Sequence, residues 1–462
     1  MTLIENNLYS YFKPKNALTR WFQPIAISCL LFAPISLSLA VESSVSEESS
    51  LQAKPVSASL PDPLTLEYAL ALAEKNKPVM TLAENNIAAS RLQTQIQQSN
   101  MGASLSLKAR ARWIESPAAL AHLGREDHAA KIVLNKPLYD FGRTSNRVQA
   151  GSKVEELNTL QLQQNMQTLR LQVMRAFFDV LLADLSYARA NEAMAMGYIY
   201  YDRAKERQSV GQRSELDVLE KDSDYQASRQ VRYESESQQR LTRNYLSLLL
   251  DRPGNLPSKL IMPKLEYHKK KIKPVENLQE QALKNNLTLA MLHQEISALS
   301  LQMKSIRAQR MPVLSAELET GVYEREIGSN DRWRAGVVFD MPLYQGGKVS
   351  AETALKKTEI DNLQIRVYQE EQLIKQQVLE HWLTLSDLSI QAVASNTLYD
   401  YREYYLDRAR ALYEMEVKSD LGDSMVELSA ASFKVAEAQF EIAMRWEMLA
   451  QITQMSIEEM AE

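Results

Sequence analysis

The distribution of proline constrains this chain most strongly. No proline occurs between Pro137 and Pro253, nor after Pro342, which leaves two runs of 115 and 120 residues without the strongest helix breaker. Glycine is sparse too, at 13 of 462 residues. With 45% hydrophobic and 24% charged residues, the composition argues against both general disorder and a polytopic helical membrane protein. The two runs therefore predict long, rarely interrupted helices in a folded chain.

The first run carries a heptad seam. Apolar and small residues recur at alternating steps of four and three from Leu162 to Ala204, which predicts coiled-coil packing of a structural core. We expect one helix from about Arg143 to Ser209, roughly 100 Å long, and a shorter one from Ser214 to Leu250. The helical stretch Leu64 to Gln98 would supply the missing length, so that two short helices flank the long one. The second run, from Thr358 to Tyr413, has a looser seam.

Each long run has one reversal. The reversals are the segments 210–218 and 417–425. In both, a serine precedes a new stretch of apolar periodicity, as a helix N-cap would. Each run is therefore expected to form a helical hairpin.

The chain is internally repeated. The segment 135–143 recurs as 340–348, displaced by 205 residues, and the sequence at 74–76 has an echo at 284–286. Two structural repeats follow from this.

The repeats divide the chain into four parts after the leader. The first repeat, 64–256, holds a short helix, a β-hairpin, a long helix and a short helix, and the second repeat is 277–456. A linker, 257–276, joins them, and 457–462 forms a C-terminal tail. The linker is rich in lysine, which indicates either a solvated connector or a binding patch.

The first 40 residues have the features of an export signal. Two lysines and an arginine precede an apolar stretch that ends in the small-residue triplet Ser38-Leu39-Ala40. A membrane anchor is the alternative, but the stretch is shorter than the ~20 residues that a span needs and contains two prolines. The single cysteine, Cys29, lies inside this stretch in a poor context for lipidation. Residues 41–63, rich in Ser and Glu, predict a flexible leader.

Several kinds of site are excluded by composition. One cysteine cannot make a disulfide framework or a cysteine-built zinc site, and the five histidines show no HxxxH or HExxH spacing. No Ser-His-Asp set, phosphate loop or paired acid site stands out, so we expect neither an enzyme nor a metal or other cofactor. A net charge of −5 also makes nucleic acid a poor candidate partner.

Two stretches in each repeat alternate between apolar and polar residues. They are 103–113 and 130–135 in the first repeat, and 314–322 and 333–340 in the second. Four strands of about ten residues with a Trp near the loop end of each hairpin are typical of a membrane-spanning β-barrel, although a half-buried soluble sheet alternates too. The polar residues expected to face the lumen include Lys108, Arg110, Arg112, Glu317 and Glu319.

Four strands cannot close a barrel. The smallest membrane barrels have about eight strands, and open edges in lipid leave backbone groups unpaired. If the strands span a membrane, several copies must share one barrel. Pro137 and Pro342 would then end the second and fourth strands, and Gly142 and Gly347 would let the chain swing into a helix.

The repeated Pro-Leu-Tyr, the glycines that follow it and the reversal Val210-Gly211…Ser214…Asp217-Val218 resemble the TolC-like outer-membrane efflux protein family. The similarity covers about residues 64 to 456. It implies a mainly α fold with a small β part: a two-repeat protomer of long coiled-coil helices plus four strands. Three protomers would form a 12-stranded outer-membrane β-barrel and an α-helical barrel in the periplasm.

The resemblance also implies function and site residues. It implies a homotrimeric exit duct that works with a periplasmic adaptor and an inner-membrane transporter to expel drugs, other small molecules or secreted proteins. In the second tip Val417 stands where the family has glycine, and Asp420 and Asp423 either narrow the aperture, with Glu427 beside them, or cap the returning helix. The expected adaptor contacts are Val210, Gly211, Ser214, Asp217 and Val218.

One alternative stays open at this point. A periplasmic adaptor or another soluble coiled-coil scaffold would explain the long helices. It would not explain four alternating strands flanked by a repeated Pro-Leu-Tyr motif.

Overall fold

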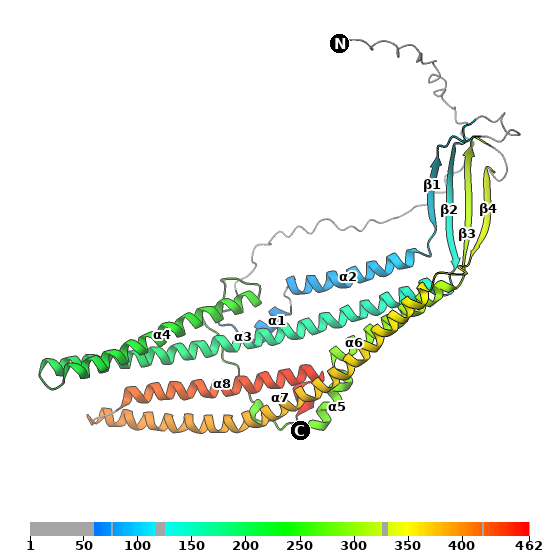
Figure 1. Cartoon of the computed structure of the whole chain (residues 1–462). Helices are drawn as coiled ribbons and strands as arrows, with labels where there is room; N and C mark the ends of the chain where they lie inside the picture. The colour runs from blue at the N-terminus through cyan, green and yellow to red at the C-terminus, as the bar shows by residue number, and fades with distance from the viewer. Residues whose placement is uncertain (1–59, 75–76, 116–124, 326–330, 418–419, 462) are drawn as a thin grey trace, which may run out of the picture. The chain divides into compact units, whose positions relative to one another are not determined.

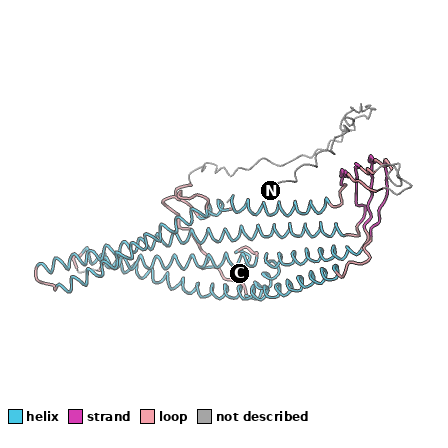
Figure 2. Tube along the Cα trace, turned by 45° about the horizontal axis from the view of Figure 1, so that its top comes forward, coloured by secondary structure: helices cyan, strands magenta, loops and turns pink. Residues whose placement is uncertain are grey.

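The computed structural model describes residues 60–74, 77–115, 125–325, 331–417 and 420–461. The expected signal peptide, 1–40, and nearly all of the leader lie outside these residues. Two long helical hairpins and one small sheet make up the described part. The strands gather at one end of the long helices, and the reversals of both hairpins lie at the other end (Figures 1 and 2).

The two halves of the chain have the same order of elements. The helices of the first half are α1 (Leu66–Ala73), α2 (Lys77–Ser99), α3 (Arg143–Ser209) and α4 (Glu215–Leu249). Those of the second half are α5 (Val275–Asn285), α6 (Leu287–Arg307), α7 (Lys348–Glu414), α8 (Leu421–Thr453) and α9 (Ile457–Met460). The strands are β1 (Ser104–Arg110), β2 (Ala129–Tyr139), β3 (Val313–Tyr323) and β4 (Trp333–Asp340).

The two long helices match each other closely. Helices α3 and α7 each have 67 residues, about 100 Å at 1.5 Å per residue. Helix α7 begins 205 residues after α3, the same displacement as that of the repeated motif. The predicted bounds of α3 are confirmed, and α4 begins one residue after the predicted Ser214, which is its N-cap.

The prediction of one helix from Leu64 to Gln98 is wrong, because the stretch forms the separate helices α1 and α2. Pro78 lies in the first turn of α2. Proline lacks an N–H and clashes with the carbonyl four residues earlier, so a helix tolerates it only in its first turn. In the second half, Asn286 ends α5 in an extended conformation and caps α6 by accepting from the Thr288 backbone N–H.

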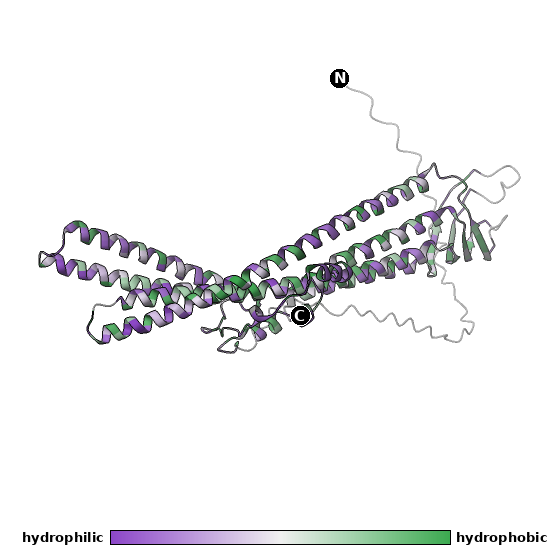
Figure 3. Ribbon diagram, turned by 90° about the horizontal axis from the view of Figure 1, so that it is seen from below, coloured by the Kyte–Doolittle hydropathy of each residue, from purple (hydrophilic) through white to green (hydrophobic). Residues whose placement is uncertain are grey.

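Two shorter helices cover the two halves of α3, as predicted. Helix α2 runs along the half nearer the sheet, where Arg91 and Glu155 form an ion pair of 2.7 Å. Helix α4 runs along the other half, where Gln239 donates to Asp184 at 2.8 Å. Hydrophobic and hydrophilic residues alternate along all of these helices, as their striped colouring shows (Figure 3).

Beside the middle of α3 lies the larger of two hydrophobic clusters. Here α3 is buried on several sides, since Val173, Phe177 and Phe178 are at most 2% exposed. Phe178 stacks on Phe440 of α8 with ring centroids 4.3 Å apart. Segments distant in sequence, including α1 and the residues around Leu260, join this cluster and so tie both halves of the chain together.

The C-terminal segment, expected as a tail, packs against the second cluster. Helix α9 places Met460 there with no exposed surface. The Lys273 backbone N–H donates to the Met460 carbonyl at 3.0 Å, and Ile272 pairs with Ala461 in an antiparallel bridge. The linker and the chain end therefore hold each other in place.

The sheet has the antiparallel order β1-β2-β3-β4. Leu105 pairs with Leu134, Leu134 with Leu318 and Leu318 with Ala335, so one face of all four strands is apolar. On this face Leu107 is 73% exposed and Val337 is 64% exposed. A soluble protein rarely leaves so continuous an apolar sheet face uncovered, whereas a lipid-facing surface has this character.

Pro137 does not end the second strand as predicted. Strand β2 continues to Tyr139, with a register shift between these two residues. A missing N–H is tolerated at a bulge. Pro342 does follow the end of β4, which stops at Asp340.

At both junctions the chain turns from strand to helix at a glycine. Gly142 and Gly347 are the N-caps of α3 and α7, with φ of 85° and 81°. At the first junction Asp140, which sequence reasoning missed, accepts from the backbone N–H groups of Gly142 and Thr144. Its carboxylate therefore satisfies donors that the N-cap glycine cannot satisfy.

Removing the Phe178 ring should destabilise the hydrophobic cluster beside the middle of α3. Phe178→Ala is expected to cost about 3–5 kcal/mol, because it leaves a cavity in a well-packed core. Backbone amides of α3 near Val173 should then exchange with solvent roughly a hundredfold to several thousandfold faster in hydrogen-exchange mass spectrometry. Tyr68→Ala, at a side chain that is 45% exposed, is the control. Equal exchange in both variants would contradict the assigned core.

Candidate functional site: a polar sheet face and two helix tips

The polar face of the sheet is held together by ion pairs across strands. Glu319 on β3 accepts from Lys131 of β2 at 3.0 Å and from Arg334 of β4 at 2.8 Å. The Tyr323 hydroxyl also donates to Glu319, at 2.6 Å. One carboxylate therefore links three strands.

The other predicted lumen residues are arranged differently. Glu317 accepts from Asn135 at 2.9 Å. Arg110 and Arg112 both pair with Asp127, a buried carboxylate just before β2, although Arg112 itself lies beyond the end of β1. Lys108 lies opposite Lys131 in the register and makes no ion pair with any described residue. The polar face thus mixes paired and free charges.

The first tip is a tightly closed turn. Gly211 has φ of 75°, and the backbone N–H of Gln212 donates to the Arg207 carbonyl at 2.8 Å, which closes the end of α3. The Ser214 side chain accepts from the Asp217 N–H while the Asp217 carboxylate accepts from the Ser214 N–H. This capping box assigns Ser214 and Asp217 a structural role in holding the turn.

The exposed apolar side chains of this tip are only partly those predicted. Val210 is 67% exposed, whereas Val218 is half-buried. Leu216 and Leu219, which were not predicted, are 75% and 58% exposed. Three apolar side chains therefore project into solvent beside Gly211, which has open space where a Cβ would be.

In the second tip, the position that corresponds to the glycine of the first tip is not the expected Val417. The residue with the left-handed backbone is Glu416, with φ of 59°, and not Val417. The Val417 N–H donates to the Leu412 carbonyl, as that of Gln212 does to Arg207 in the first tip. Glu416 is thus the counterpart of Gly211. The predicted serine N-cap of the returning helix is also wrong, because the N-cap is Asp420.

The acidic residues of the second tip bind neighbouring side chains. Asp420 makes no side-chain capping bond and instead accepts from the Tyr405 hydroxyl at 2.6 Å. Glu427 pairs with Arg402 of α7 at 3.2 Å. Asp423, in the first turn of α8, accepts a hydrogen bond from Tyr200 of α3. Asp420 is therefore the N-cap residue by its position, while the side-chain bonds of the two aspartates go to tyrosines of α7 and α3.

Helix α8 meets α3 along one stripe near this tip. The stripe consists of Glu192, Met196 and Tyr200, spaced four residues apart on α3. Glu192 accepts from the Ser429 hydroxyl of α8. Met196 fills the space beside Gly422, where a Cβ would meet its sulfur. Together with Tyr200–Asp423, these contacts fasten one hairpin to the other.

Tyr200 is held in its neutral form by this environment. Partial burial and, next, the hydrogen bond to Asp423 raise the pKa of Tyr200 from 10.0 to about 12. The hydrogen bond to Asp420 likewise raises the pKa of Tyr405. Both hydroxyls are therefore donors throughout the physiological range.

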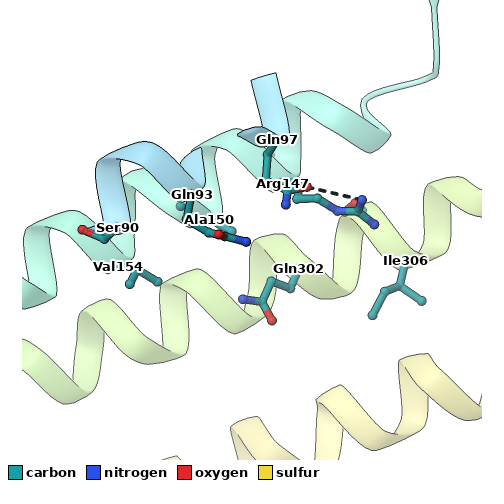
Figure 4. Close-up of a pocket in the computed structure, with 10 residues that line it drawn as sticks. Ser90, Gln93, Gln97, Arg147, Ala150, Val154, Gln302 and Ile306 are labelled. Carbon is teal, nitrogen blue, oxygen red and sulfur yellow. Dashed lines mark hydrogen bonds between the residues drawn. The ribbon is translucent and has the colours of Figure 1, made fainter. Parts of the chain in front are cut away.

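A cavity of about 360 Å³, lined by both polar and aliphatic side chains, lies between α2, α3 and α6. Figure 4 shows Arg147 donating to Gln97 across it, with Gln302 opposite. The cavity has neither a nucleophile–base pair nor two facing carboxylates. Among the described residues, no group of three His, Cys, Asp or Glu could hold a metal ion. No described helix is both long enough and apolar enough to cross a membrane.

Comparison with known proteins identifies the family. A profile of the outer membrane efflux protein family matches residues 69–251 and 278–451, most of the chain. The chain belongs to the outer membrane efflux protein family. It forms an exit duct for efflux in the outer membrane, with its helical part in the periplasm. The family resemblance drawn from the repeated motifs is thereby confirmed.

Solved structures share the fold of this efflux protein. The Campylobacter jejuni CmeC outer membrane channel is 14% identical, with a TM-score of 0.70 over 87% of this chain and 89% of that one. The Vibrio cholerae outer membrane protein VceC is 12% identical, with a TM-score of 0.65 over 85% and 96%. The Neisseria gonorrhoeae MtrE outer membrane channel is 15% identical, with a TM-score of 0.62 over 85% and 89%. No curated protein matches the chain.

Neither the family nor these neighbours are enzymes. The predicted mainly α fold with a small four-stranded sheet is confirmed. A coiled-coil adaptor, the alternative drawn from the sequence, does not account for the sheet or for the family match.

The contact between Tyr200 and Asp423 should be lost at alkaline pH, where the Tyr200 hydroxyl loses its proton. Because the pKa of Tyr200 is higher in the folded protein, its stabilising contribution is complete below about pH 10 and is lost as pH rises toward about 12. In an ultraviolet titration of tyrosinate, Tyr200→Phe should remove a component above pH 11. Loss of a component at lower pH instead would contradict the Tyr200–Asp423 contact.

Proposed function

We propose that three copies of this chain form a passive duct through which a periplasmic adaptor and an inner-membrane pump expel substrates. The observation that carries this proposal is the pair of open sheet edges. Strands β1 and β4 each have one neighbour among the described strands. Three four-stranded sheets placed edge to edge give twelve strands, enough to close a barrel whose apolar faces point to lipid.

The edge helices support assembly in a ring. On α2 and α4, which pack chiefly against α3, Leu82 and Leu241 are 66% and 64% exposed. On α7, at the other edge, Ile390 and Tyr404 are 71% and 76% exposed. Two different apolar edges fit a head-to-tail interface, which closes into a ring when the rotation between copies is right.

The contacts of α8 with α3 provide a gate at the periplasmic tip. Moving α8 away from α3 would break the hydrogen bonds of Asp423 and Glu192, and hydrogen bonds to charged groups contribute about 1.5–3 kcal/mol each. An adaptor that binds the separated arrangement more tightly would shift the equilibrium toward an open tip. Asp420, Asp423 and Glu427 would then form the acidic mouth.

The adaptor would dock on the first tip. The capping box of Ser214 and Asp217 and the turn at Gly211 hold this tip in one shape. Val210, Leu216 and Leu219 supply apolar surface for the hairpin of a partner. Val218, by contrast, would support the tip from inside.

The remaining assignments follow the same scheme. Residues 1–40 would direct export, and 41–63 would form the leader. Residues 64–256 and 277–456 would be the two repeats, and 257–276 would be the equatorial linker. Lys108 and the paired residues Arg110, Arg112, Glu317 and Glu319 would line the lumen.

Loss of the hairpin contact should make the closed duct leak. Asp423→Ala and Tyr200→Phe each remove a hydrogen bond of roughly 1.5 kcal/mol, which corresponds to about a tenfold larger open population. Single-channel recording in planar bilayers would show this as more frequent opening without adaptor. Tyr245→Phe should behave as wild type. A closed-state conductance unchanged in both variants would argue against a gate at this contact.

Charge on the first tip should uncouple the duct from its pump. Leu216→Lys with Leu219→Lys places two charges on the apolar surface, so efflux in cells should fall at least tenfold while single-channel conductance stays normal. Ala227→Lys, on an exposed part of α4, is the control. Full efflux by the double variant would mean that the adaptor docks elsewhere.

A further inference from the structure

Basic side chains concentrate where the strands meet the helices. The connecting segments 99–104, 135–148, 304–313 and 339–352 hold seven Lys or Arg and three carboxylates, in a chain of net charge −5. The local excess is positive although the chain is acidic. The cations are Lys136, Arg143, Arg147, Lys304, Arg307, Arg310 and Lys348.

Lys136 lies on the apolar face of the sheet. It pairs with Ala316 two positions along from the pair Leu134–Leu318, and the register shift of β2 comes only after Pro137. Lys136 is exposed and makes no ion pair with a described residue. A lysine on a lipid-facing surface extends its ammonium group to the nearest headgroup region.

An aromatic collar indicates that this end of the sheet is at the headgroup level. Tyr139 and Phe141 contact each other edge to face, with ring centroids 4.7 Å apart. Phe339 and Tyr344 are 64% and 89% exposed. Aromatic side chains concentrate at both interfaces of a membrane, and Trp113 and Trp333 occupy the opposite end of the sheet.

Helix α6 adds two cations close to this level. Lys304 and Arg307 are three residues apart, so they share one face of the helix, and both are exposed. Strand β3 begins six residues after Arg307. The Arg307 guanidinium contacts only the Met303 sulfur, at 3.7 Å, among the hydrogen bonds and ion pairs of the described residues. Arg147, by contrast, donates to Gln97 in the cavity between α2, α3 and α6, and Arg310 donates to Ser350.

We infer that Lys136, Lys304 and Arg307 bind the phosphate groups of anionic phospholipids in the periplasmic leaflet of the outer membrane. The inference rests on the proposed trimer and on the sheet being the membrane span. Three copies would then give a ring of such sites around the duct. The exposed collar beside Lys136 favours a lipid over a soluble phosphate, because it offers apolar surface to the acyl chains.

Native mass spectrometry of the purified protein tests this inference. Incubated with phosphatidylglycerol or phosphatidylcholine, wild-type protein should retain the anionic lipid preferentially. Each cation removed should weaken that retention about fivefold, as expected for charges near an anionic surface. The variants are Lys136→Gln alone and Lys136→Gln with Lys304→Gln and Arg307→Gln. Lys205→Gln, far along α3 and also exposed, should keep the wild-type preference.

Two results would overturn the inference. One is equal retention of phosphatidylglycerol by wild type and by the triple variant. The other is displacement of the bound lipid by inorganic phosphate or glycerol phosphate, which would mean a soluble phosphate site. Conductance keeps this test separate from the proposed function: wild type that conducts without lipid preference defeats only the lipid site, whereas wild type that neither trimerises nor conducts defeats the duct.

Discussion

Backbone pairing at the edges of the sheet governs the rest of the structure. In hydrocarbon, an N–H or C=O without a partner costs several kcal/mol, because no water can replace the missing bond. Within the described residues, the sheet of one chain has two open edges, at β1 and β4, and an exposed apolar face. Insertion into a membrane pairs both edges and places the apolar face in lipid only when several copies form one closed barrel. Closure by assembly also leaves an enclosed passage, so the same constraint that requires several copies provides the function.

The long helices extend this passage away from the membrane. A helix of about 100 Å gains most of its stability from packing along its length. Here α2 and α4 cover different halves of α3, and the cluster around Phe178 holds the middle. The tip of α8 is held to α3 by the side-chain contacts Tyr200–Asp423 and Met196–Gly422, while its other acidic side chains bind α7. A firm middle with a separable end is suited to a duct that opens at its tip.

Local sequence signals predicted the fold well. The proline-free runs, the repeat at 205 residues and the period-two strands led to α3, α4 and the sheet. Pro78 was the overlooked local signal that splits α1 from α2. The contacts of the candidate site were harder to predict from the sequence, because the residues that form them are far apart in the chain. Tyr200 contacts Asp423, and Glu319 contacts Lys131. Glu416 shows another limit, since the hydrogen bonds that end α7 impose a left-handed backbone on a residue that seldom adopts it.

The mass of the conducting unit tests the central claim most directly. Purified protein should be weighed by native mass spectrometry, and the same preparation should be recorded in planar bilayers. If three chains form one barrel, the particle should have the mass of three chains and should conduct ions. A single chain that conducts, or a single water-soluble chain that does not, would contradict it.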